Sequence, residues 1–361
     1  MPSQLFTPLT LGPVEFRNRV FIAPMCQYSV HERDGVPTDW HLVHLGSLAS
    51  GGASLVITEA TAVSPEGRIS PQDTGLWNDE QEAAWAHIVA FLHERGAKAG
   101  IQLAHAGRKA STYAPWGQEG RHGTVPADEG GWRPVAPSAA PYPGYDTPEA
   151  LDAAGIEKVV SDFRAAAERS IRAGFDVLEV HAAHGYLLHQ FLSPLSNARD
   201  DEYGGALENR ARLLVRVVDA VTDAVAGRAA VFVRFSATDW TPGGWTESDT
   251  ATVAGWARDA GAVFFDVSSG GNAPAQIPVG AGYQVRFAHY VKSLAGVPTG
   301  AVGIINAAEQ AEQIVASGQA DAVLIAREAL RDPHTPLRWA RTLGVDGPAA
   351  AWQPQYERAK L

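Results

Sequence analysis

The strongest chemical signal in this chain is a pair of histidines followed closely by a tyrosine: His181, His184 and Tyr186. Two neutral imidazoles can donate N–H hydrogen bonds to a carbonyl oxygen, and a phenol beside them could give a proton to a substrate carbon. The spacing would also suit a metal pair. However, no Asp, Glu or third His stands at a matching place, so we predict no metal site. The alternative for Tyr186 is a tyrosine at the rim of a pocket.

The single cysteine of the chain, Cys26, lies at the end of the first strand-like run. One thiol cannot form an internal disulfide, and it cannot supply a cysteine cluster for zinc or iron–sulfur. The simplest interpretation is a small buried hydrophobe, because free cysteines are mostly buried. If the chain is a (β/α)₈ barrel, however, this end of the first strand opens into the active-site face.

A glycine and an arginine late in the chain could form an anion site. Gly303 lies near the end of the seventh strand-like run, and Arg327 lies at the end of the eighth. In a (β/α)₈ barrel the ends of the last two strands often hold a phosphate. Glycine lets backbone N–H groups approach an anion, and arginine adds a charged fork. The alternative is that Gly303 only ends a strand and that Arg327 pairs with a surface acid.

Composition limits the class of protein. The chain has 361 residues, 45% of them hydrophobic, and a net charge of −11. Such acidity disfavours nucleic acid and anionic membranes as partners. No apolar run approaches a membrane span, and the N-terminus lacks the basic-then-apolar layout of a signal peptide. We therefore expect one cytoplasmic domain over residues 1–361 that binds neither nucleic acid nor membranes.

Apolar strand-like runs alternate with amphipathic stretches along the whole sequence, which predicts an α/β fold. About eight such units indicate a (β/α)₈ TIM barrel. A doubly wound sheet is the main rival, but its G-x-G-x-x-G turn is absent. The expected strands are Arg19–Met25, Ser54–Thr61, Lys98–His105, Asp176–His184, Ala229–Ser236, Val263–Ser269, Thr299–Ile305 and Asp321–Ala326. Expected helices include Glu80–Arg95, Ile156–Ala173, Leu207–Val225, Ser248–Asp259 and Ala307–Ser317.

Two segments fall outside this alternation. Residues Phe6–Phe16 resemble a short hairpin that could plug the floor of the barrel. The segment Gly107–Thr147, after the third strand, is long and rich in Gly and Pro, and loops of this length are usually functional. His41 and His44 lie on a predicted helix, where we expect packing or surface roles.

At these residues the chain resembles the old yellow enzyme family of FMN-dependent ene-reductases, and within it the thermophilic-like subclass that contains a cysteine. The resemblance covers essentially the whole chain, and its strongest part runs from His181 to Asn209. The segments that carry it are Ala23–Tyr28, Gln102–Lys109, His181–Leu187, Phe191–Pro194, Asn197–Gly205, Val233–Arg234 and Arg327–Pro333.

The resemblance implies an FMN site at the mouth of the barrel. The flavin ring would lie over the first strand, Gln102 would bind its pyrimidine part, and Arg234 would face the N1–C2 carbonyl region. The phosphate would be held by Gly303, Ala326 and Arg327, with Ser268. The full implied set is Ala23, Pro24, Met25, Cys26, Ala60, Gln102, Arg234, Ser268, Gly303, Ala326 and Arg327.

The resemblance also implies a reaction. NADPH or NADH would reduce the flavin, and a hydride would pass from flavin N5 to Cβ of an enone, maleimide or nitroalkene. His181 and His184 would grip the substrate carbonyl with help from Tyr28, and Tyr186 would protonate Cα. Cys26 would tune the flavin potential without attacking the substrate. A flavin-binding redox sensor that uses Cys26 without turnover is the alternative.

A tail of about residues 345–361 would reach a neighbouring subunit in this subclass, and Arg358 of the motif Gln355-Tyr356-Glu357-Arg358 would line that subunit's substrate mouth. We therefore expect a homodimer or homotetramer. The chain departs from the family twice. Ala359-Lys360-Leu361 replaces the usual ending, and Ala326 stands where Gly is usual, which is tolerable only at negative φ.

Overall fold

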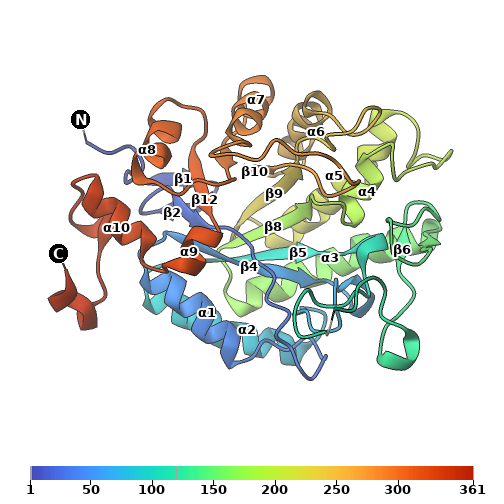
Figure 1. The fold of residues 1–361 in the computed structure, drawn as a ribbon, viewed down its shortest axis with the longest axis horizontal. Coiled ribbons are helices and arrows are strands. Elements are labelled where there is room, and N and C mark those ends of the chain that lie inside the picture. The colour runs from blue at the N-terminus through green and yellow to red at the C-terminus, as the bar shows by residue number, and fades with distance from the viewer. Residues whose placement is uncertain (1, 119, 361) are drawn as a thin grey trace.

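The computed structural model describes residues 2–118 and 120–360, and its centre is a closed barrel of eight parallel strands (Figure 1). Hydrogen bonds run in the order β3-β4-β5-β8-β9-β10-β11-β12, and β12 pairs with β3 to close the barrel. The strands are β3 Val20–Ile22, β4 Leu55–Ala62, β5 Lys98–Ala104, β8 Val177–Ala182, β9 Ala230–Ser236, β10 Phe264–Ser268, β11 Thr299–Ala301 and β12 Ala322–Ile325. The predicted TIM barrel is confirmed.

Helices connect successive strands and surround the barrel (Figure 1). They are α1 Asp39–Ser50, α2 Asp79–Glu94, α3 Ala153–Ala173, α4 Leu187–Leu192, α5 Leu207–Val225, α6 Glu247–Asp259, α7 Val285–Ala295, α8 Ala308–Ala316, α9 Arg327–Arg331 and α10 Thr335–Thr342. The sequence explains their ends. For example, the Asp152 side chain accepts from the Gly155 N–H to cap α3, and Gly174 closes it at φ 93°.

The expected hairpin forms and closes the floor of the barrel. It consists of β1 Leu9–Leu11 and β2 Val14–Phe16, which pair antiparallel. Phe16 is fully buried, and its ring centroid lies 4.9 Å from that of Phe21 on β3. The hairpin thereby packs on the apolar lower layer of the barrel interior.

The long segment after β5 is ordered by short elements rather than by helices. It contains the parallel pair β6 Val135–Ala136 and β7 Glu149–Ala150. Trp132 donates from Nε1 to the Glu66 carbonyl at 2.8 Å, and exposed Trp116 meets Tyr28 edge-on with 5.2 Å between ring centroids. The 3₁₀ turns of the chain are Pro65–Gly67, Gly107–Lys109, Ala127–Glu129, Pro348–Ala350 and Pro354–Ala359.

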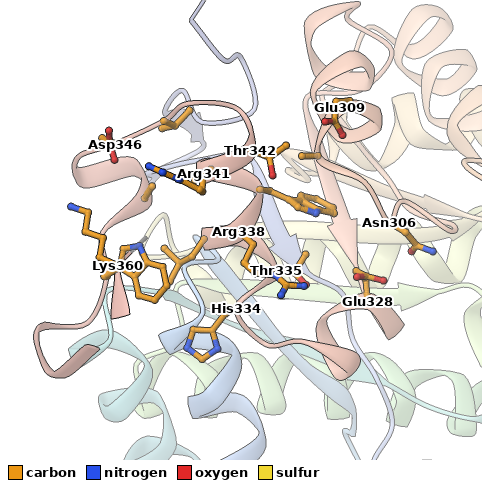
Figure 2. Close-up of a pocket in the computed structure, with 17 residues that line it drawn as sticks. Asn306, Glu309, Glu328, His334, Thr335, Arg338, Arg341, Thr342, Asp346 and Lys360 are labelled. Carbon is orange, nitrogen blue, oxygen red and sulfur yellow. The ribbon is translucent and has the colours of Figure 1, made fainter. Parts of the chain in front are cut away.

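The C-terminal tail follows α10 on the outside of the barrel (Figure 1). Tyr356 packs on His334, with 5.8 Å between ring centroids. A cavity of about 490 Å³ lies between α8, α10 and the tail, and Trp339, Trp352 and Lys360 help to line it (Figure 2). Leu361, the last residue of the expected tail, lies outside the described residues. Among residues 2–118 and 120–360, no helix combines the length and apolarity that a membrane span requires.

Candidate active site

The register of the barrel brings polar side chains from three neighbouring strands to one end. Gln102 on β5 pairs with Ala60 on β4 and with Glu179 on β8. His181, two residues further along β8, pairs with Arg234 on β9. Because the carboxyl ends of parallel strands share one face of the barrel, these residues converge there.

His181, His184 and Tyr186 form a compact cluster at this face. The imidazole centroids lie 5.2 Å apart with the rings nearly perpendicular. The Tyr186 ring lies 5.1 Å from that of His181, also edge-on. His181 is 3% exposed, so its polar edge works in a largely water-free environment.

Both imidazoles are neutral. Burial lowers the pKa of His181 well below its usual range, and the positive charge of Arg234 lowers it further. Burial and Arg234 lower the pKa of His184 in the same way. The Ala183 N–H donates to His181 Nδ1 at 3.3 Å, which leaves the ring proton on Nε2. His184 Nε2 lies 2.9 Å from Ser268 Oγ.

Two glycines explain how His184 reaches this position. His184 and Gly185 both have positive φ, 58° and 73°. A Cβ on Gly185 would lie 2.3 Å from the Gly271 carbonyl oxygen, and a Cβ on Gly271 would lie 2.7 Å from His184 Cα. Only glycines let the loops after β8 and β10 approach this closely. Lys109 ties the same loops by donating to the His184 and Gly271 carbonyls at 2.9 and 3.0 Å.

Tyr186 is held as a neutral phenol. Burial raises its pKa well above the usual value, and the neighbouring Cys26 and Asp73 raise it further. The Lys109 ammonium stands 5.1 Å from the centroid of the Tyr186 ring. A phenol of this kind carries a proton at all physiological pH values and can give it up only to a strongly basic atom.

Cys26 and Tyr28 face a small apolar cluster that also contacts Tyr186 and includes Ala60. Burial raises the pKa of the Cys26 thiol, and the charges of Asp73 and Glu59 raise it further, so the thiol stays protonated. Glu59 fixes this segment, because it accepts from the Gln27 N–H at 2.9 Å and contacts His41 at 3.0 Å. His41 is buried, and its ring accepts from the Thr38 N–H at 2.8 Å.

Gln102 and Arg234 lie deeper in the barrel than the histidine pair. Gln102 donates from Nε2 to Glu179 Oε1 at 2.8 Å, and no described donor reaches its own Oε1. Arg234 contacts Asp266 through Nε at 2.8 Å, and within the described residues its Nη1 and Nη2 have no hydrogen-bond acceptor. An acceptor and a cation are thus left for a ligand.

The expected phosphate corner is a cavity of about 190 Å³ at the ends of β11 and β12, and Gly303, Ile304, Ala326 and Arg327 help to line it. Gly303 has φ 116°, and a Cβ there would lie 2.8 Å from Gln284 Nε2. Ile304 also has positive φ, 51°, so the expected strand Thr299–Ile305 ends at Ala301 and the backbone turns out. Ala326 has φ −125°, which satisfies the condition for alanine at that position.

Several predicted residues play a less direct part in this geometry. Ser268 is not among the residues that line the phosphate cavity. Its Oγ lies between His184 and the Gln284 carboxamide, 3.3 Å from Oε1. Arg358 is exposed, and no hydrogen bond joins it to the described part of the chain. Ala23, Pro24 and Met25 form the loop after β3, which Ala23 begins by donating from its N–H to the Ile325 carbonyl at 2.9 Å.

Sequence reasoning gave no role to three residues of this site: Lys109, Glu179 and Asp266. A signal existed for the two acids, because each stands between two apolar residues of a strand, and buried acids are rare without a partner. Lys109 belongs to a segment that carried the family resemblance, but its spacing from Tyr186 in sequence gave no hint of contact. The described residues contain no group of His, Cys, Asp and Glu that could hold a metal ion.

A parallel barrel that carries an anion-sized corner, a buried cation and a pair of imidazoles at the carboxyl ends of its strands suits a flavin-dependent oxidoreductase. The model of the NADH:flavin oxidoreductase / NADH oxidase family matches residues 4–344. The chain belongs to this family, and within it to the old yellow enzyme family that its motifs resemble.

Three proteins illustrate the similarity. An NADPH dehydrogenase of Listeria innocua is 46% identical over 360 residues, which cover 99% of each chain. The structure of morphinone reductase superposes with a TM-score of 0.79 at 32% identity, covering 98% of this chain and 93% of that one. The old yellow enzyme homologue of Zymomonas mobilis has a TM-score of 0.78 at 28% identity, covering 100% and 99%.

The protein is therefore an enzyme, an oxidoreductase that uses FMN with NAD(P)H. The structure fits this cofactor. Gly303 has a φ of 116° that favours glycine, the Arg327 guanidinium has no acidic partner among the described residues, and the buried Arg234 offers unpaired donors. Each of these features suits a dianionic phosphate or an electron-rich ring.

Proposed function

We propose that this enzyme reduces the activated C=C bond of α,β-unsaturated carbonyl compounds. The observation that carries the proposal is the cluster of His181, His184 and Tyr186, which places two neutral imidazoles beside a protonated phenol. Bound FMN, once reduced by NAD(P)H, supplies the hydride for the β carbon.

The imidazoles bind the substrate oxygen. His181 donates from Nε2, because its Nδ1 accepts from Ala183. Ser269 donates to the Gln284 carboxamide at 2.7 Å, which leaves the Ser268 hydroxyl free to donate to His184 Nε2. That donation keeps the His184 ring proton on Nδ1. Two such donors stabilise the negative charge that grows on the oxygen as the hydride arrives. Tyr28 packs against the same apolar cluster as Tyr186.

Tyr186 delivers the proton to Cα. Its raised pKa means that it does not protonate neutral groups, whereas the carbanionic Cα is basic enough to take the proton. The alternative, a redox sensor that uses Cys26, is disfavoured because its thiol is protonated, and the thiolate is the reactive form. We place the enzyme in the cytoplasm, as one domain. We also propose that Arg358 of a neighbouring subunit borders the mouth in a homodimer or homotetramer.

The test is reduction of 2-cyclohexen-1-one by NADPH in D₂O with the purified yellow protein. We expect cyclohexanone with one deuterium, at Cα, because the hydride comes from the nicotinamide through the flavin and the proton from an exchangeable hydroxyl. Tyr186→Phe should slow saturation without loss of FMN. Oxidation of NADPH with no saturated ketone would overturn the proposal and leave the FMN chemistry intact.

A further inference from the structure

A layer of polar residues crosses the barrel interior at the level of Gln102 and Arg234. Gln102 on β5, Glu179 on β8, Arg234 on β9 and Asp266 on β10 are 2%, 0%, 7% and 0% exposed. Below them the interior is apolar and includes Phe21, Phe232 and Phe264. Among the described residues the layer is therefore closed from beneath by apolar side chains, and it faces the mouth, where the flavin would bind.

The charges in this layer do not balance. Arg234 is a single cation, and it contacts Asp266 at 2.8 Å. Glu179 accepts from the uncharged Gln102, while its Oε2 and the Oδ1 of Asp266 are buried without a hydrogen bond in the described chain. If both acids were ionised, the layer would hold one uncompensated negative charge in a water-free interior, which is costly.

A proton on Glu179 removes that cost. Burial and the negative charge of Asp266 raise the pKa of Glu179 to about 8, against the opposing effects of Arg234 and the hydrogen bond from Gln102. Arg234 and Asp266 are the charged groups that face it, since β5 contributes only Gln102 and the layer below is apolar. Glu179 is thus neutral in mildly acidic solution and becomes charged in mildly alkaline solution.

We propose that Glu179 is a positioning residue that orients Gln102 toward the flavin and takes up a proton when the flavin is reduced in alkaline solution. The proposal rests on FMN binding and not on the choice of enone as substrate. Because Glu179 holds Gln102 Nε2, the carboxamide oxygen is left as an acceptor for a ring N–H.

The proton balance follows from charge. NAD(P)H transfers a hydride, which is two electrons and one proton, so the bound flavin gains one unit of negative charge over Arg234. That charge disfavours a second anion in the layer and raises the proton affinity of Glu179. Where Glu179 is ionised before reduction, one further proton from solvent binds to it during reduction.

The test is the midpoint potential of the bound FMN as a function of pH, from 6 to 10, measured by anaerobic titration with dithionite and a reference dye. In the wild-type protein we expect uptake of one proton per two electrons below about pH 8. Above about pH 8, in the window where reduction makes Glu179 take up a proton, we expect two protons per two electrons. Glu179→Gln should take up one proton throughout. Asp266→Asn should move the window to lower pH, because Asp266 raises the proton affinity of Glu179. As a control, Asp176→Asn changes an acid outside this layer, bound to His93 and Lys98, and should keep the wild-type profile.

FMN affinity tests the positioning role separately. The glutamine of Glu179→Gln can still accept from Gln102, so the Kd for FMN should stay within about threefold of wild type. Glu179→Leu removes the acceptor and should raise the Kd by about tenfold, the equivalent of one buried hydrogen bond.

Two results would overturn the proposal: a wild-type proton count in Glu179→Gln, or unchanged FMN affinity in a folded Glu179→Leu protein. If Glu179→Leu does not fold, the proton count of Glu179→Gln decides alone. None of these readouts depends on enone turnover, so failure here is distinguishable from failure of the proposed function.

Discussion

Replacing His181 by alanine should slow substrate reduction by two to three orders of magnitude while FMN stays bound. His181 is 3% exposed, neutral, and donates from Nε2 because Nδ1 accepts from the Ala183 N–H. A donor aimed at developing negative charge in such a site contributes about 2.7–4 kcal/mol to transition-state stabilisation, or about 10²–10³ in kcat. The ring touches Tyr186 and His184 rather than the phosphate corner, so cofactor loss is not expected.

The assay separates the two half-reactions by rapid mixing. Photoreduced enzyme is mixed with 2-cyclohexen-1-one, and the return of flavin absorbance gives the oxidative rate. His93→Ala is the matched control, since His93 pairs with Asp176 outside the mouth. The low pKa values of His181 and His184 keep both rings neutral through pH 6–8, so their titration should put no step in the wild-type rate there. Reoxidation of His181→Ala within threefold of wild type would refute the assignment of this donor.

Three further changes test other parts of the site. Cys26→Ser should retain turnover and shift the flavin potential. The wild-type thiol should react slowly with iodoacetamide at pH 7.5, because its raised pKa keeps it protonated. Complete loss of turnover in Cys26→Ser would make Cys26 a chemical participant. Gly185→Ala should lower the free energy of unfolding by more than about 2 kcal/mol, since it adds a 2.3 Å backbone contact to positive φ. Gly205→Ala, with φ 74° and no neighbour within 4 Å, measures the φ cost alone, and equal losses would contradict the clash. Deleting Gln355–Leu361 should raise the KM for enones with FMN retained, and light scattering that shows a fully active wild-type monomer would exclude a shared Arg358.

The barrel itself could be predicted from the sequence because its signals are local. Continuous apolar runs of strand length, separated by amphipathic stretches, locate each βα unit. The expected helix Leu207–Val225 has the bounds of α5. Errors arose where a local run outlasted the strand. Thr299–Ile305 remains apolar after Ala301, but the positive φ of Gly303 and Ile304 directs the backbone into the phosphate corner.

The histidine pair could be placed at the mouth for the same reason, since a strand end fixes its position. The contacts that set the chemistry of this pair, however, could not be predicted from the sequence. Ser268 meets His184 across 84 residues of sequence, and Gln102 meets Glu179 across 77. Such contacts depend on which strands are neighbours and on the register between them, and neither can be obtained from spacing along one chain.

Glu179 and Asp266 show why these contacts between strands matter for function. Glu179 and Asp266 interrupt apolar strands, where a charge is costly, and no local rule explains them. In the barrel they flank Arg234, the one cation of that layer. A single carboxylate would neutralise the arginine. The second acid is costly in its charged form, and its proton affinity therefore depends on any charge that appears above Arg234. A layer with one cation and two acids is thus poorly suited to stability alone, and well suited to respond when a flavin above it gains charge.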